Sequence, residues 1–236
     1  FPDNENEVVT KNGFILNGEF RIKAADVDDA YVLQNNETFV FWVKSSATHS
    51  TSHYLFRIQS DGPEILYQPS TGIIKIVIPK AAGGTAHQIL RKINLNSLSH
   101  IVLTFDHDSE AVLYVNSIPL GPSIDLTSDV ANVGGGLLTI GSHAFDMDWG
   151  FIEAAVFKST FTHAEVKEAY NFGNYFDLKT HSQESSLQHY WTFGDHPADI
   201  FDNNGDNKLT ATINDTARSN NLIIDAANAA TNDKIA

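Results

Sequence analysis

The sequence predicts an all-β protein, a sandwich of two antiparallel sheets with one short helix. Three observations support this fold class. Short apolar segments recur along the 236 residues with turn signals between them, the side chains of several segments alternate between two faces, and one segment carries the boundary signals of a helix. A parallel sheet would need helical crossovers between its strands, and the sequence does not show that alternation.

The predicted strands are separated by clusters of residues that break strands, such as Ser60–Pro63 and Asp202–Asp206. In one strand, Phe39, Phe41 and Val43 point to one face and the residues between them point to the other, so we expect one face of each strand to lie in the core. The predicted strands are Gly13–Ile22, Thr38–Lys44, Tyr54–Gln59, Glu64–Gln68, Ile73–Ile78, Gln88–Ile93, His100–Asp106, Ala111–Val115, Leu137–Ile140, Gly150–Phe157, Leu187–Phe193 and Lys208–Ile213.

One helix is predicted near residues 162–172. Thr162 and Glu165 have the T-x-x-E spacing of a capping box, in which each side chain bonds to the backbone N–H of the other residue. Gly173 follows the helical segment and can take the left-handed backbone conformation with which many helices end.

No linker divides the chain, so we expect one domain over residues 1–216 and a C-terminal tail over residues 217–236. The tail is rich in Ala, Asn and Asp and has one apolar patch, Leu222–Ile224, which leaves open whether it is loose or packed on another surface. The chain begins at Phe1 rather than Met, which favours proteolytic maturation or export, with trimming of the sequence as the alternative.

The composition excludes several classes of function. The chain carries 15 Lys and Arg against 29 Asp and Glu, a formal charge of −14, which argues against binding to nucleic acid or to an anionic membrane. No cysteine is present, so disulfides, thiolate metal sites and cysteine nucleophiles are excluded. No apolar run approaches the roughly 20 residues that a membrane-spanning helix needs, and we expect no membrane insertion.

Several segments match, in order, the landmarks of one domain family. They are FRIKAADVDDAYVLQNNETFVFWVK from residue 20, SHIVLTFDHDSEAVLYVNSIPLG from residue 99, LTIG from residue 138, WGFIEAAVFKSTFTHAEVKEAYNFG from residue 149 and LQHYWTFGDHPADIFDNNGDNKLTATI from residue 187. Together they resemble the laminin-G-like domains, and the resemblance implies a concanavalin-A-like jelly roll. Two residues depart from the family pattern: Ser117 replaces the usual Gly after Asn116, and Ile152 stands where the family often has Asp. The same sandwich serves lectins, adhesins, glycosidases and structural parts, so the resemblance names no chemistry.

Catalysis would require paired carboxylates. Retaining glycosidases place two of them about 5 Å apart, and those of this fold carry both on one strand. Glu153 has no carboxylate two or four residues after it, although Asp146 and Asp148 could line a cleft with it. We therefore expect no enzyme activity, and expect Glu153 to be a partly buried acid that is hydrogen-bonded to a neighbouring strand or loop. A glycoside hydrolase remains an alternative.

Calcium is the cofactor that the sequence favours, because this ion takes several oxygen ligands from flexible loops. Asp146 and Asp148 alternate in the loop before Trp149, and laminin-G-like modules often bind calcium at this rim. The loop Asp202–Asn207 also carries acids, but turn formation explains it more simply.

Ligand contacts are predicted at Trp149, His143 and Tyr54, since an exposed aromatic side chain beside polar groups suits a sugar. Trp42 and Trp191 lie inside predicted strands and are expected in the core. The sequence thus predicts a non-catalytic module outside the cell or on a virion surface. It would act in structural assembly, with identical copies or a larger structure, or in recognition of a protein or glycan, with a calcium-dependent lectin as an alternative.

Overall fold

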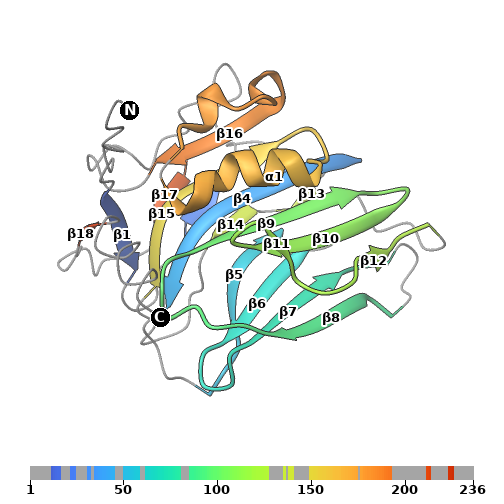
Figure 1. Cartoon of the computed structure of the whole chain (residues 1–236). Coiled ribbons are helices and arrows are strands. Elements are labelled where there is room, and N and C mark those ends of the chain that lie inside the picture. The colour runs from blue at the N-terminus through green and yellow to red at the C-terminus, as the bar shows by residue number, and fades with distance from the viewer. Residues whose placement is uncertain are drawn as a thin grey trace, which may run out of the picture.

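Two antiparallel sheets face each other across a hydrophobic core, and a helix packs on the outer side of one of them (Figure 1). The predicted antiparallel sandwich with one short helix is confirmed. The computed structural model describes residues 12–16, 22–24, 31–32, 35–45, 50–58, 62–80, 85–127, 135–136, 138–140, 149–174, 176–192, 211–213 and 223–225.

The large sheet has nine strands in the described part of the chain. Its central strands are also its longest, β4 (Asn36–Ser45), β9 (Ser99–Asp106) and β15 (Trp149–Phe157). The order is β11 (Ile118–Pro119), β10 (Glu110–Val115), β9, β4, β15, β1 (Asn12–Leu16) and β18 (Ile223–Asp225), with β12 (Ile124–Asp125) beside β10 and β16 (Leu187–Thr192) beside β15.

The small sheet has seven strands among the described residues, and β8 stands at one end of it. The order is β17 (Ala211–Ile213), β2 (Ile22–Ala24), β14 (Leu138–Ile140), β5 (His53–Ile58), β6 (Glu64–Gln68), β7 (Ile73–Ile78) and β8 (His87–Lys92). A separate pair is formed by β3 (Tyr31–Val32) and β13 (Gly135–Gly136).

The core between the sheets is built by side-chain alternation. Phe39, Phe41 and Val43 of β4 enter it, as predicted. The expectation that only one face of each strand is buried is wrong for β4 and β9, because Val40 and Val102 are buried in a second cluster on the outer side of the large sheet. That side is covered by the segment that follows β15.

Helix α1 (His163–Tyr170) supplies part of this cover through Val166 and Ala169. The predicted capping box is present: Thr162 and Glu165 bond to each other's backbone N–H. The helix ends earlier than predicted, at Asn171, which has φ 45°, whereas Gly173 does take the predicted left-handed conformation, with φ 85°. Asn is one of the few residues other than Gly that take this conformation routinely, since its short side chain can bond locally.

Two segments form structures that differ from those their sequence patterns predict. The segment Gly13–Ile22 forms two strands in different sheets, β1 and β2. The apolar patch of the predicted tail overlaps β18, in which Ile224 lies opposite Gly13 of β1. The division into residues 1–216 and 217–236 stays a prediction.

Within the described ranges, no helix is long and apolar enough to cross a membrane.

Candidate functional site

The predicted rim lies mostly outside the described residues. His143, Asp146 and Asp148 fall in that part of the chain, so both the rim and its calcium site stay predictions. Trp149 begins β15, where its backbone lies opposite Ser45 of β4. In the portion that the structure describes, no group of three or more His, Cys, Asp or Glu residues is placed to hold a metal ion.

Tyr54 is the predicted ligand residue whose side chain the structure describes, and it lies on the outer face of the small sheet. The strand register places it opposite Leu66 of β6, which lies opposite Lys75 of β7, which in turn lies opposite Leu90 of β8. These four side chains form one row across the sheet, because residues that lie opposite each other share a face.

Two parallel rows flank this one, and we call the three rows together the outer β5–β8 face. Their side chains are half-buried or exposed, whereas Ile65 and Ile76, which point the other way, are buried in the core. The flanking rows are Arg57, Glu64, Val77 and Gln88 on one side, and Gln68, Ile73 and Lys92 on the other.

Arg57 is held by its neighbours on this face. Its Nε lies 2.9 Å from Glu64 Oε1, and its guanidinium carbon lies 4.6 Å from the centre of the Tyr54 ring. One face of the tyrosine is therefore covered and the charge of Arg57 is paired. Lys75 and Lys92 form no ion pair with any residue that the structure describes.

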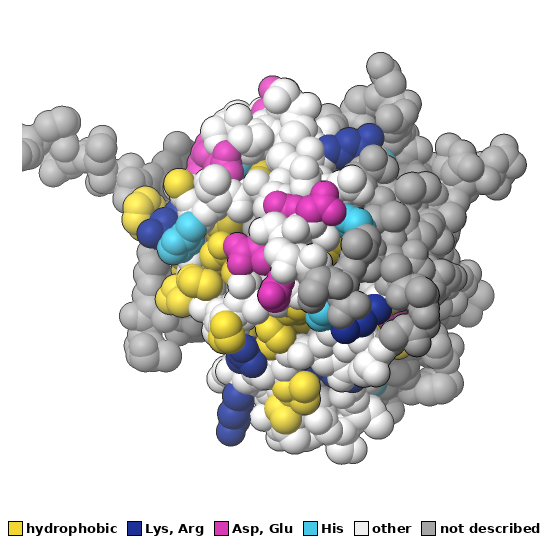
Figure 2. All heavy atoms as spheres, turned by 90° about the vertical axis from the view of Figure 1, so that its right-hand side faces the viewer, with side chains coloured by type: hydrophobic (Ala, Val, Ile, Leu, Met, Phe, Trp, Pro, Cys, Tyr) yellow, Lys and Arg dark blue, Asp and Glu magenta, His cyan; other side chains and the backbone are white. Residues whose placement is uncertain are grey.

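The charges of the chain are unevenly distributed. Residues 50–98, which include β5–β8, hold five of the 15 Lys and Arg but two of the 29 Asp and Glu. Residues 99–127, which include β9–β12 of the large sheet, hold four Asp and Glu and no Lys or Arg. In Figure 2, Lys, Arg and hydrophobic side chains lie together in the lower part of the view, at the height of β7 and β8 in Figure 1, and the large acidic patches lie above them.

The free side of β8 is occupied by Arg91. Its Nη1 donates to the carbonyl of Leu90 at 2.9 Å, and its Nε donates to the carbonyl of Leu120 at 3.2 Å. Gly121 has φ 83°, and a Cβ there would collide with the guanidinium. The loop after β11 thus clamps Arg91 along the strand and fixes this border of the outer β5–β8 face.

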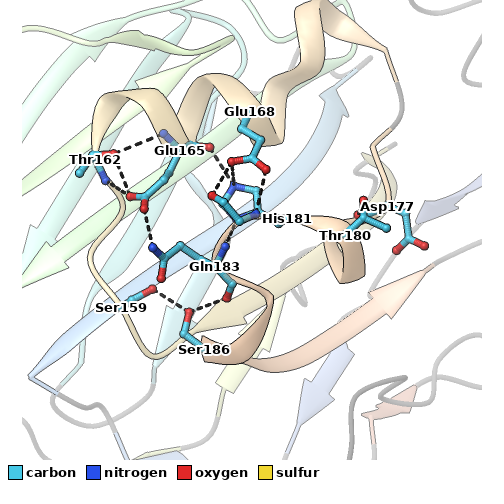
Figure 3. Close-up of polar contacts among 10 residues, drawn as sticks. Ser159, Thr162, Glu165, Glu168, Asp177, Thr180, His181, Gln183 and Ser186 are labelled. Carbon is cyan, nitrogen blue, oxygen red and sulfur yellow. Dashed lines mark hydrogen bonds and ion pairs between the residues drawn. The ribbon is translucent and has the colours of Figure 1, made fainter.

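The outer face of the large sheet is closed by a polar cluster around His181 (Figure 3). His181 Nε2 donates to the carbonyl of Glu165 at 3.0 Å, its Nδ1 accepts from the N–H of Gln183 at 3.0 Å, and its ring stacks on Phe161 at 4.6 Å. Glu168 accepts from the N–H of Ser182 at 2.8 Å. These bonds tie α1 to the short 3₁₀ helices η3 (Leu178–Thr180) and η4 (Glu184–Ser186).

This cluster was missed by the sequence interpretation, because its members lie 14 to 18 residues apart and follow no motif. The cluster also shifts the pKa of the Glu165 carboxyl. Partial burial of Glu165 opposes its charge, but hydrogen bonds from Thr162 and Gln183 outweigh that effect and hold the pKa of the carboxyl below its ordinary value. Since this cover closes the large sheet, the small sheet has the open outer face in the described part of the molecule.

Glu153 is fully buried, and its Oε2 accepts a hydrogen bond from the Tyr190 hydroxyl at 2.9 Å. The predicted hydrogen bond to a neighbouring strand is confirmed, because Tyr190 belongs to β16, which pairs with β15. The prediction of partial burial is wrong, since the cover over the large sheet excludes solvent. A carboxyl held in this way is not presented to a substrate on the surface.

His100 is buried in β9, where its ring packs against the rings of Trp42, at 4.9 Å, and Tyr170, at 5.7 Å. Burial lowers its pKa to about 3, so the ring is neutral. Among the described residues, neither of its ring nitrogens has a hydrogen-bond partner. Trp42 and Trp191 are buried, which confirms their predicted place in the core.

The sequence comparisons identify a family. The model described as the concanavalin A-like lectin/glucanases superfamily, Laminin_G_3, matches residues 21–167, which is more than half of the chain. A comparison with curated proteins gives no match.

Solved structures similar to this chain include binding domains of two larger proteins and a pentraxin. The ligand binding domain of botulinum neurotoxin serotype D, in complex with N-acetylneuraminic acid, has a TM-score of 0.53 and 15% identity, over 68% of this chain and 42% of that chain. The binding domain of Paraclostridial Mosquitocidal Protein 1 has a TM-score of 0.52 and 14% identity, over 68% and 46%. The native heptameric SAP-like pentraxin from Limulus polyphemus has a TM-score of 0.50 and 12% identity, over 68% and 82%.

At these identities the likeness shows the fold, a concanavalin-A-like jelly roll, and confirms the predicted class. The chain spans less than half the length of these two binding domains.

Proposed function

Because the chain belongs to the concanavalin A-like lectin/glucanases superfamily, we propose that it is a non-catalytic module that binds a glycan or protein surface through its outer β5–β8 face. One observation carries the proposal: no described segment covers this face, and it combines apolar side chains with amides and with lysines that pair with no acid in the described part of the chain. Binding sites commonly combine apolar surface with a few polar groups that fix the orientation of the ligand.

The similar structures support a binding role. The botulinum neurotoxin and Paraclostridial Mosquitocidal Protein 1 structures are described as binding domains, and the former is in complex with N-acetylneuraminic acid. The burial of Glu153 beneath the cover of the large sheet is in keeping with a function that does not depend on that acid. We propose that the protein acts in the extracellular space or on a virion surface. The chain has no cysteine, so its folding in either place does not depend on disulfide formation.

A glycan array tests the proposal when it is probed with the parent chain and with Leu90→Asn, a substitution at a side chain that is 55% exposed on the outer β5–β8 face. Ile118→Asn is the matched control, because Ile118 is 68% exposed and lies on the large sheet. We expect Leu90→Asn to weaken binding at least fivefold and Ile118→Asn to leave it unchanged.

Two results would overturn the proposal. If binding survived Leu90→Asn but was lost with Trp149→Ala, the rim would be the binding site. If the parent chain hydrolysed oligosaccharides and Glu153→Gln abolished the turnover, the chain would be an enzyme.

A further inference from the structure

Lys75 and Lys92 of the outer β5–β8 face, which pair with no acid that the structure describes, are close neighbours. Lys75 of β7 lies opposite Leu90 of β8, and Lys92 follows Leu90 by two residues in β8. Such diagonal positions on one face of a sheet are about 7–8 Å apart. The one acid of this face, Glu64, is already paired with Arg57. The face therefore presents two cations without a counter-charge among the described residues, which favours an anionic ligand.

Apolar side chains lie between and beside these lysines. Leu66 and Leu90 flank Lys75 in its row, and Ile73 lies opposite Lys92. Gln68 and Gln88 add amides, which can both donate and accept hydrogen bonds. Carboxylate or sulfate groups match the lysines, hydroxyls match the amides, and the C–H faces of sugar rings match the aliphatic side chains. An anionic polysaccharide combines all three kinds of group.

The size of the face argues against a protein partner. Strands lie about 4.8 Å apart and rise about 3.3 Å per residue, so three rows over four strands cover on the order of 300 Å². A stable protein interface buries about 800 Å² on each partner. A second copy of this chain would need contacts well beyond the face, whereas a segment of a few sugar units fits within it.

The net charge of the chain limits how large the anion can be. Exposed charges are screened over about 8 Å at physiological ionic strength, so a short or thin ligand interacts mainly with the lysines beneath it. A nucleic acid duplex would extend over the acidic surroundings as well, since the whole chain carries −14.

We propose that the outer β5–β8 face binds an acidic polysaccharide, with Lys75 and Lys92 pairing with its carboxylate or sulfate groups while Leu66, Ile73 and Leu90 contact its sugar rings. This inference rests on the proposed function and names its ligand class.

Calorimetric titration with matched probes tests the inference. Oligogalacturonate and its methyl ester differ in the carboxylate charge, and sulfated and unmodified dextran oligomers differ in sulfate. The test variant is Lys75→Gln/Lys92→Gln. The control, Lys158→Gln/Lys179→Gln, removes the same charge from exposed lysines elsewhere. We expect an acidic probe to bind at least tenfold more tightly than its neutral form, with at least a tenfold loss in the test variant and less than twofold in the control.

The other outcomes separate the inference from the proposed function. Equal losses in the two variants would mean general charge attraction and would overturn the inference. Equal binding of neutral and acidic probes, lost with Leu90→Asn, would overturn the inference and keep the proposed function. If no probe bound and sedimentation showed a dimer that the test variant abolished, the occupant would be a second copy. If no probe bound and no dimer formed, the inference would be wrong, and the glycan array with Leu90→Asn would decide the proposed function separately.

Discussion

At the scale of single residues, the buried side chain of His100 makes the free energy of unfolding depend on pH. In the unfolded chain its imidazole has the ordinary pKa of 6.5, whereas in the folded protein burial lowers the pKa to about 3. The unfolded state therefore binds a proton between these values that the folded state does not, and stability falls as the pH drops below 6.5. By pH 4 this residue alone should remove about 3 kcal/mol.

The replacement His100→Leu should abolish that loss, because it keeps a similar volume beside Trp42 and Tyr170 and cannot titrate. Urea unfolding of both proteins between pH 8 and pH 4 measures the difference. Parallel stability profiles for the two proteins would contradict the prediction.

Ser117 carries backbone strain in the turn between β10 and β11. Asn116 has φ 50° and Ser117 has φ 63°, a pair of left-handed residues typical of a tight hairpin. The departure from the family's glycine at this position thus has a conformational cost. The Ser117 carbonyl accepts from His163 Nε2 at 2.9 Å, a contact that any residue can make through its backbone.

We therefore expect Ser117→Gly to raise the free energy of unfolding by about 0.5–1 kcal/mol, since relief of strain exceeds the added freedom of the unfolded chain. Ser117→Ala is the control, because alanine keeps the Cβ and should bring no gain. The midpoint of urea unfolding reports both variants, and an equal effect of Gly and Ala would contradict the assignment to strain.

At the scale of elements, α1 depends on the charge of Glu165. Partial burial opposes that charge, but hydrogen bonds from Thr162 and Gln183 lower the folded pKa below 4.5. A carboxyl with a depressed folded pKa stabilises the protein above its unfolded pKa, and this stabilisation is lost as the pH falls through the folded value. Glu165→Gln should therefore be less stable than the parent chain at pH 7, and the difference should narrow as the pH falls through the folded pKa of Glu165. A constant gap in melting temperature over this range would contradict the prediction.

Elements whose signals are local were predicted well from the sequence. Strands β6 and β7 match their predicted bounds, and the capping box of α1 was found because it needs only residues 162 and 165. Two departures have physical reasons. Asn171 ends α1 before Gly173 because both residue types tolerate a left-handed conformation. The segment Gly13–Ile22 crosses between sheets, which the alternation of apolar residues does not encode.

At the scale of the whole molecule, the sequence predicted one residue of the proposed binding face, Tyr54, as a ligand contact. The alternation of β6 and β7 shows which side chains point outward, but only the register brings Lys75 and Lys92 together. Which sheet keeps an open outer face depends on where residues 158–187 pack. Those contacts join residues that are distant in the sequence, such as Thr38, whose hydroxyl donates to the carbonyl of Ser159.

The same packing predicts that the sandwich unfolds as one unit. Removing residues 174–236 would take Leu178, Leu187 and Tyr190 from the second hydrophobic cluster and would remove the Tyr190 hydroxyl that donates to Glu153. We expect the 1–173 fragment to lack a cooperative thermal transition and to bind a hydrophobic dye. Cooperative melting of the fragment close to the parent temperature would show that β16 does not close the sheet.

The clamp of Arg91 over Gly121 also bears on how the protein behaves at high concentration. An unprotected strand edge is a template on which further chains can add, and repeated addition leads to fibrils. Gly121→Ala would displace the guanidinium from the Leu90 carbonyl and open β8. Gly173→Ala is the control, because it places a side chain at φ 85° far from this edge. We expect thioflavin-positive fibrils from the Gly121→Ala variant and none from the control. This result would show that the position of the Arg91 side chain at the edge of β8 prevents the protein from polymerising.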